Sequence, residues 1–184
     1  MSELDELREV QTASREIFDG KIMHVFEDTV RLPDGNAATR EYMRHIGAVC
    51  VIPVLENGDV LVERQYRYPV GQVLTEIPAG KLDRRDEDRL LAAQRELREE
   101  TGAEAGEWTS LGLFYPACAY SDEAIEMFLA RGIRFGERHL DKDEFLNVAR
   151  MPLAALLEAV MAGEVPEAKT QIAVLKAARL LGLR

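Results

Sequence analysis

Three glutamates with a spacing suited to binding a divalent cation lie in the acidic segment 80–102, namely Glu96, Glu99 and Glu100. On a helix with about 100° per residue, the three side chains fall within about 60° of one direction. Like charges at these spacings repel each other, and a hard cation such as magnesium offsets this repulsion while keeping positions for water and phosphate oxygens. The alternative interpretation is a solvated helix face with ion pairs such as Arg95–Glu99.

The spacing of the whole segment resembles the signature of the Nudix family. That signature is a glycine, five spacers, a glutamate, seven spacers and then R-E-U-x-E-E-x-G-U, where U is a bulky aliphatic residue. The run 95–102 matches, and Glu87 stands eight positions before its arginine. Two departures are the small Ala103 and the six residues, instead of five, that separate Gly80 from Glu87. We attribute the second to one extra residue in the loop 83–86; the alternative is that the last residue of this loop, an aspartate, replaces the glutamate.

The resemblance implies a metal-dependent hydrolase that cleaves a nucleoside diphosphate linked to another group. In this family, glutamates at the positions of Glu96 and Glu100 bind the metals, and Glu99 assists in binding and catalysis. The backbone carbonyl before the signature glycine, here Ala79, commonly completes a metal site. We expect Mg²⁺, with Mn²⁺ or another divalent cation as alternatives. Such cations shield the phosphate oxygens and activate a water molecule.

Over residues 14–182 the chain is similar to the ADP-ribose and nucleotide-sugar pyrophosphatase branch of that family. This similarity implies that Arg67 contacts the substrate's phosphates and that Arg40 reaches across a dimer to the nucleotide. Arg64 and Glu76 lie in matching segments and are further substrate-binding candidates. A guanidinium suits phosphate because it presents a fixed fork of donors, although Arg40 is equally well interpreted as a surface strand residue. The local matches are residues 40–41, 64–69, 76–80, 114–116, 121–123, 163–165 and 168–170.

The general base is expected on or near the loop that follows Tyr115-Pro116. Glu123 matches the loop glutamate of related enzymes, and Glu126 is the alternative, because strand alternation leaves its direction open. ADP-ribose-selective members typically read Pro-Ser-Pro-Gly in this loop, whereas this chain has Cys118 and Ala119 at the last two positions. The substrate is therefore ADP-ribose or another nucleotide sugar.

Composition restricts the function classes. The formal net charge is −10, from 33 acidic and 23 basic residues, which argues against a nucleic-acid partner because phosphate surfaces require a basic stripe. Cys50 and Cys118 have no neighbours at metal-ligand spacing. No apolar run approaches the roughly eighteen residues of a membrane span, and the acidic N-terminus lacks a signal core. We expect a cytoplasmic protein with a small-molecule nucleotide substrate and no membrane partner.

The elements that must position these residues predict an α+β fold, a Nudix-type mixed β-sheet sandwiched between helices. Residues 1–45 are expected to form a β-rich extension that serves a homodimer, and residues 46–184 the Nudix domain, with its signature at 80–103. A hairpin around Asn57-Gly58 is expected, because Asn-Gly between apolar runs is a strong hairpin signal. Other expected elements are strands over 14–45, 74–78, 108–115 and 125–130, and helices over 88–101, from Pro152 to Gly163, and over 167–181.

Two further function classes remain open. One is a Nudix-like domain that binds a nucleotide as a sensor without hydrolysing it; such a domain is expected to lose signature carboxylates, and this chain retains them. The other is an enzyme of the same fold with different chemistry, such as an isomerase. A hydrolase of another nucleoside diphosphate derivative is an alternative with the same chemistry. The matches around Arg67 and Glu123 favour a phosphate substrate over an isomerase.

Overall fold

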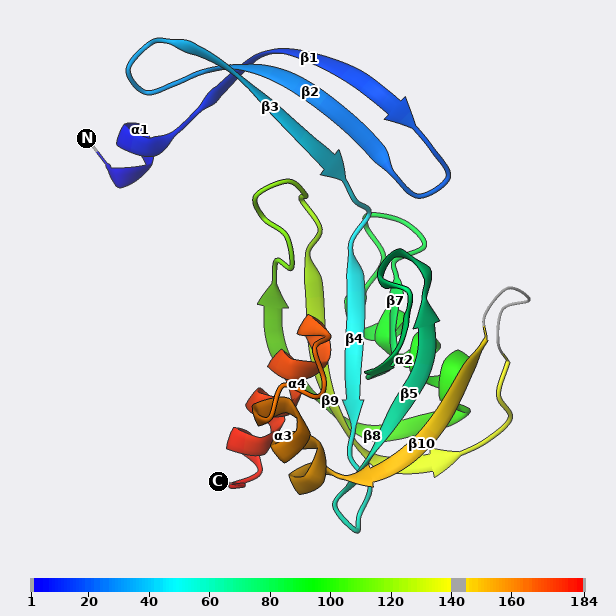
Figure 1. Ribbon diagram of the computed structural model, residues 1–184. Coiled ribbons are helices and arrows are strands. Elements are labelled where there is room, and N and C mark those ends of the chain that lie inside the picture. Colours follow the sequence, from blue (N-terminus) through cyan, green and yellow to red (C-terminus); the bar gives the residue numbers. More distant parts are fainter. Residues whose placement is uncertain (1, 140–144, 184) are drawn as a thin grey trace. The chain divides into compact units, whose positions relative to one another are not determined.

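The computed structural model describes residues 2–139 and 145–183. The chain forms two compact units, drawn in Figure 1. The first, here called the N-terminal unit, consists of Met1–His45 together with Ala117–Glu123. The second, here called the larger unit, consists of Ile46–Pro116 and Ala124–Arg184. The loop that carries Glu123 therefore belongs to the N-terminal unit, although it lies far along the chain.

The N-terminal unit is an antiparallel sheet in the order β1-β2-β3. Turns separate the strands: Gly20 N donates to Met23 O, and Leu32 N donates to Asn36 O. Every residue of the first strand is exposed. The first strand begins four residues before the expected start at residue 14. The unit contains α1 (Glu3–Leu7), β1 (Val10–Asp19), β2 (His24–Arg31) and β3 (Ala37–Arg44).

The larger unit contains two sheets, with strand orders β7-β4-β9-β8 and β10-β5-β6. Strand β4 runs parallel to β9 and antiparallel to β7, and all six of its residues are buried. A strand that is buried on both faces is typical of a sheet covered on both sides. The strands are β4 (Ala48–Pro53), β5 (Asp59–Arg67), β6 (Gln72–Glu76), β7 (Ala79–Lys81), β8 (Ala103–Phe114), β9 (Ile125–Phe135) and β10 (Leu146–Pro152).

The predicted hairpin around Asn57-Gly58 is only partly present: its turn forms, but the prediction that the two flanking strands pair with each other is wrong. The turn itself forms, since Gly58 has φ +84 and its amide donates to Leu55 O at 3.0 Å. Beyond one bridge, Val54–Val60, the two strands separate into different sheets. The reason is that both edges of β4 are occupied, by β7 and β9, so β5 pairs with β6 and β10 instead.

Helices cover both sides of the β4 sheet, as the predicted fold class requires (Figure 1). Alternate residues of β4 enter two cores: Cys50 joins the core with helices α3 and α4, and Val51 joins the core with helix α2. The predicted helices form within one or two residues of their expected bounds. They are α2 (Arg89–Thr101), α3 (Leu153–Met161) and α4 (Ala168–Leu180), with a short 3-10 helix at Tyr68–Val70.

The predicted strands over 108–115 and 125–130 are too short, and two strands, β7 and β10, were not predicted. β8 begins at Ala103 and β9 continues to Phe135, because the two pair with each other along nearly their full lengths. β10 escaped prediction, since only Leu146 among its residues is buried and no clear alternation marks it. Within the described residues, none of the helices is long and apolar enough to cross a lipid bilayer.

Candidate active site

Helix α2 carries the three glutamates, and residues at its two ends define where it starts and stops. The Asp88 side chain accepts hydrogen bonds from Leu90 N at 2.9 Å and Leu91 N at 3.0 Å, which caps the first turn. Gly102 ends the helix in the left-handed conformation, at φ +69. One face of the helix buries apolar residues, and Glu96 and Glu100 are buried beside them with 9% and 4% exposure. Glu99 is more accessible.

Glu96 lies directly against the backbone of β7. A Cβ atom added to Gly80 would stand 2.0 Å from Glu96 Cδ and 2.2 Å from each carboxylate oxygen. The absence of a side chain at Gly80 therefore lets the carboxylate approach the strand. Arg95 Nη1 donates to Glu96 Oε1 at 2.7 Å and lies 3.4 Å from Glu99 Oε2.

Glu100 is held by the same strand. Its Oε2 accepts a hydrogen bond from Ala79 N at 3.0 Å. The two residues expected to share a metal site, Ala79 and Glu100, are thus neighbours, and ligation by the Ala79 carbonyl remains a prediction.

Arg95 connects α2 with the loop before it. Its Nη2 donates to Lys81 O at 3.2 Å and lies 3.5 Å from Glu87 Oε1, while Nε lies 3.6 Å from Asp83 Oδ2. Burial lowers the pKa of Arg95, but the charge of Glu96 and the neighbouring carboxylates outweigh it and the net shift is upward. Asp86 is 85% exposed and pairs with Arg84. The contact of Glu87 with Arg95 supports one extra residue in the loop over replacement of the glutamate by Asp86.

The donor set of α2 suits a hard divalent cation, since it offers carboxylates on a rigid helix beside a core. Among the described residues, three ligand atoms that lie mutually within 4.8 Å occur at Glu16, Asp19 and His24 of the N-terminal unit. The glutamates of α2 do not form such a group; Glu96 is bonded to Arg95 and Glu100 to the Ala79 amide.

A buried carboxylate holds the predicted phosphate-binding arginine. Glu76, which is 1% exposed, accepts from Arg67 Nε at 2.6 Å and from Arg67 Nη2 at 2.7 Å. Lys169 Nζ donates to the same carboxylate. Burial raises the pKa of Glu76, but the bonds from Arg67 and the charge of Lys169 shift it below its usual value. The bond to Glu76 raises the pKa of Arg67, and the charges of Glu167 and Glu100 act in the same direction.

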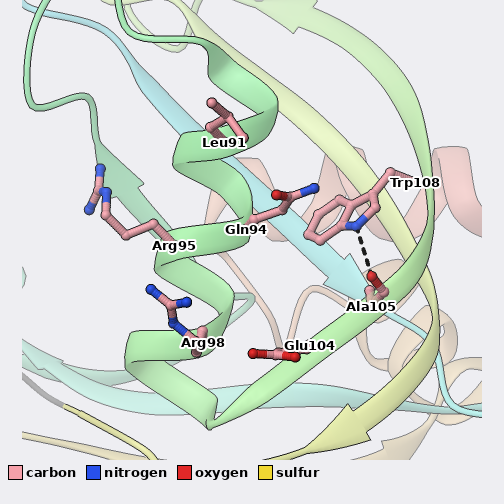
Figure 2. Close-up of a pocket in the computed structure, with 7 residues that line it drawn as sticks. All are labelled: Leu91, Gln94, Arg95, Arg98, Glu104, Ala105 and Trp108. Atoms are coloured by element: carbon pink, nitrogen blue, oxygen red, sulfur yellow. Dashed lines mark hydrogen bonds between the residues drawn. The ribbon is translucent and has the colours of Figure 1, made fainter.

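A pocket of about 430 Å³ lies between α2 and the start of β8 (Figure 2). Gln94 extends toward Trp108, whose Nε1 donates to Ala105 O at 3.2 Å, while the Arg95 side chain leaves the helix on the other side (Figure 2). None of the α2 glutamates lines this pocket. It is therefore adjacent to the carboxylate site and separate from it.

Comparison with known proteins identifies the family of this chain. The model of the NUDIX domain matches residues 43–172, and that of the nucleoside diphosphate sugar hydrolase N-terminal domain matches residues 10–43. The chain belongs to the Nudix family. The Nudix match contains α2, Arg67, Glu76 and Lys169, so the α2 carboxylates and the cluster around Glu76 lie within the family domain.

Several relatives match this Nudix chain over most of their length. An ADP-ribose pyrophosphatase of Bacillus subtilis (strain 168) is 39% identical, with 91% of each chain covered. A methanol dehydrogenase activator of Bacillus methanolicus is 36% identical over 95% of this chain and 94% of the relative. An ADP-ribose pyrophosphatase of Mycobacterium tuberculosis is 36% identical over 83% and 75%. The crystal structure of an ADP compounds hydrolase superposes with a TM-score of 0.84 at 20% identity, covering 95% of each chain, and confirms the fold.

The remaining predicted site residues of the Nudix chain fall into two groups. In the N-terminal unit, Arg40 Nε donates to Glu9 Oε2 at 2.8 Å, and Glu123 lies 3.7 Å from His45 Nδ1. In the larger unit, Arg64 donates to Thr75 Oγ1 at 2.9 Å. Arg64 is three positions from Arg67 on β5, so the two side chains point to opposite faces of their sheet.

The structure resolves the direction of Glu126. It pairs in register with Val49, whose side chain enters the core with α2, so Glu126 points to the α2 side of the sheet. Its Oε1 accepts from Ser110 Oγ at 3.0 Å, and its Oε2 lies 3.9 Å from Arg89 Nε.

Lys169 was not among the predicted site residues. Its segment, 168–170, matched the family locally, but the contact with Glu76 joins residues 93 positions apart. The available signal was the run Glu167-Ala-Lys-Thr at the start of a helix, which indicates a cap and not a partner.

Proposed function

We propose that this Nudix chain hydrolyses the pyrophosphate of ADP-ribose or a related nucleoside diphosphate sugar, in a metal-dependent reaction. The products are a nucleoside monophosphate and a sugar phosphate. The observation that carries the proposal is the buried pair Glu96 and Glu100 against β7, with Arg67 within electrostatic reach of Glu100. Two relatives at 39% and 36% identity are named ADP-ribose pyrophosphatases.

In this proposal Glu96 and Glu100 hold the cation, Glu99 assists and the Ala79 carbonyl completes its ligands. Mg²⁺ is the proposed ion, because carboxylates and phosphate oxygens are the ligands it prefers. When bound, the ion neutralises phosphate charge and lowers the pKa of a water molecule. Arg95 orients the carboxylates through its bonds to Glu96 and Glu99.

The chain's own groups bind the diphosphate and move the proton. Arg67 binds the diphosphate oxygens and is held by the buried Glu76, and Arg40 reaches the nucleotide. Arg64, the other proposed substrate-binding residue, points to the opposite face of the sheet and does not share the contact made by Arg67. Glu123 removes a proton from the attacking water, whose oxygen bonds to phosphorus while the bridging P–O bond breaks. Glu126 is the alternative base.

Substrate preference is proposed only at the level of nucleotide sugars. A relative of 26% identity, which covers 97% of this chain, is a CMP-5'-(N-acetyl-N-hydroxy-3-aminopropyl)phosphonate hydrolase. Both the nucleobase of the substrate and the group attached to the nucleotide therefore vary among relatives. The exposed Cys118 in the β8–β9 loop occupies a position where ADP-ribose-selective members carry proline.

A second candidate function comes from the methanol dehydrogenase activator that is 36% identical to this chain. In that function the chain would stimulate a dehydrogenase. Addition of the protein to a methanol dehydrogenase assay, with and without Mg²⁺, tests this directly.

A further proposal is that the protein is a homodimer assembled through the N-terminal unit. Ile17, Phe18, Ile22 and Met23 in and around the β1–β2 turn are each about half exposed or more within one chain, and such a patch on a sheet is typical of an interface. Sedimentation equilibrium measures the mass, and a single-chain mass at micromolar concentration contradicts the dimer.

The test of the hydrolase is a substrate panel with Mg²⁺: ADP-ribose, ADP-glucose, GDP-mannose and NADH, with both products quantified by chromatography. We expect equimolar nucleoside monophosphate and sugar phosphate from at least ADP-ribose. Tight binding of these compounds without any product favours the nucleotide sensor and rejects the hydrolase.

A further inference from the structure

Glu76 is shared between two cations that come from distant parts of the larger unit. Arg67 on β5 takes both carboxylate oxygens, and Lys169 at the start of α4 also bonds Oε2. The Glu76 side chain is 2% exposed and that of Lys169 is 12%, whereas that of Arg67 is 42%. Of the three groups, only the guanidinium is accessible to a ligand of substantial size.

Lys169 is fixed in place by the cap of its own helix. Its Nζ lies 3.1 Å from Glu167 Oε1, and the same Glu167 side chain accepts from Thr170 N at 2.9 Å. Thr170 Oγ1 in turn accepts from Ile77 N at 3.0 Å. The first turn of α4 is therefore bonded to the residue that directly follows Glu76, and the ammonium and carboxylate are held on one rigid frame.

The charges around Glu76 indicate how Lys169 affects the positive potential of Arg67. A guanidinium has five N–H donors, and Glu76 accepts from two of its nitrogens. With Arg67 alone, Glu76 would form a neutral pair. Glu167, whose Oε1 lies 3.1 Å from the ammonium, adds a second carboxylate, so the four charges sum to zero. Without Lys169 the two carboxylates would leave the cluster negative, and Arg67 would have less positive potential for another anion.

We propose that Lys169 is a positioning residue that acts through Glu76, orienting Arg67 and preserving its charge for the substrate's diphosphate. This inference rests on the proposed function, because the diphosphate is the anion that Arg67 would bind. Lys169 does not touch the substrate, since its ammonium lies between the carboxylates of Glu76 and Glu167.

The first test is the kinetics of Lys169→Met with ADP-ribose and Mg²⁺. We expect KM to rise about tenfold, the equivalent of about 1.4 kcal/mol of lost binding, with kcat nearly unchanged, because the interaction is made in the ground state and the transition state alike. Lys169→Arg should restore most of the loss. The matched control is Lys176→Met, on the same helix, whose ammonium donates to the Leu111 carbonyl at 2.6 Å. A purely structural role would instead lower the melting temperature and kcat with KM unchanged, and would overturn the proposal.

The second test is a double-mutant cycle with Glu76→Gln. If Lys169 acts through Glu76, adding Lys169→Met to Glu76→Gln should not raise KM further. A full, independent rise in the double variant would show that Lys169 meets the substrate directly, and would overturn the proposal.

A binding measurement separates this inference from the proposed function. ADP-ribose is titrated calorimetrically into the same variants in EDTA, where turnover is not required. If the unmutated protein binds ADP-ribose in EDTA but does not hydrolyse it with Mg²⁺, the proposed hydrolase function fails, and weaker binding by Lys169→Met still supports the inference. If the unmutated protein hydrolyses and Lys169→Met binds equally well, only the inference fails. If the unmutated protein neither binds ADP-ribose in EDTA nor hydrolyses it with Mg²⁺, both fail.

Discussion

Gly80 shows how one missing side chain defines the position of a functional carboxylate. The Glu96 carboxyl group occupies the space that a Cβ at Gly80 would fill, and Arg95 holds it there. The obstacle to a larger residue is the mobile end of a side chain and not backbone, so the fold can accommodate a methyl group if Glu96 moves away.

We therefore predict that Gly80→Ala folds normally but loses about 10- to 100-fold in activity, as expected when the support of a metal ligand is altered. The control is Gly106→Ala on β8, where the nearest atom to a new Cβ is Gly132 O at 3.8 Å. Melting temperature and initial rates of both variants are measured. Full activity in Gly80→Ala would show that the position of Glu96 against β7 is unimportant.

The sequence predicted the carboxylates of α2 and missed Lys169 for a physical reason. Glu96, Glu99 and Glu100 lie within five positions of each other, so helix geometry alone places them on one side of α2. The partner of Glu76 lies 93 positions away, and only tertiary packing brings the two together. The buried state of Glu76 was equally unpredictable from local sequence, because a glutamate in a strand is more often exposed.

At the scale of elements, α2 is predictable because the residues directly at its two ends determine where it starts and stops. Asp88 accepts from two amides of the first turn, and Gly102 adopts the positive φ that ends the helix. The pairing of β4 was not predictable from the Asn57-Gly58 turn. That turn forms locally, but the choice of partners for a fully buried strand depends on β7 and β9, which are remote in sequence.

The cap of α2 should have a measurable energy. Asp88→Ala is expected to lower the free energy of unfolding by about 1 kcal/mol, because two amides of the first turn lose their acceptor. Asp88→Asn keeps an acceptor and should recover most of this loss. Urea titrations measure both. If Asn is as damaging as Ala, the stabilisation comes from the charge of Asp88 near the helix N-terminus and not from capping.

At the scale of the whole molecule, the choice of general base is a choice between two structural units. Glu123 belongs to the N-terminal unit, where its amide donates to Ser121 Oγ at 3.1 Å. Glu126 belongs to the larger unit, on the side of the sheet that faces α2. A base on the loop would require the N-terminal unit to take part in catalysis.

We predict that Glu123→Gln lowers kcat by at least about 100-fold, the usual contribution of a general base, and that Glu126→Gln lowers it much less. The pH dependence of kcat is measured for both. Loss of the acidic limb in Glu126→Gln, with Glu123→Gln near normal, would assign the base to the larger unit and contradict this prediction.

The central claim is that the buried glutamates of α2 bind the cation of a pyrophosphate hydrolase. Its most direct test is the rate of AMP release from ADP-ribose with Mg²⁺, for the unmutated protein and for Glu100→Gln. Glutamine keeps an acceptor for the Ala79 amide but removes the charge. We predict turnover by the unmutated protein and a loss of about 100- to 1000-fold in the variant, since a metal contributes several kcal/mol to the transition state. Undiminished AMP release by Glu100→Gln would contradict the account.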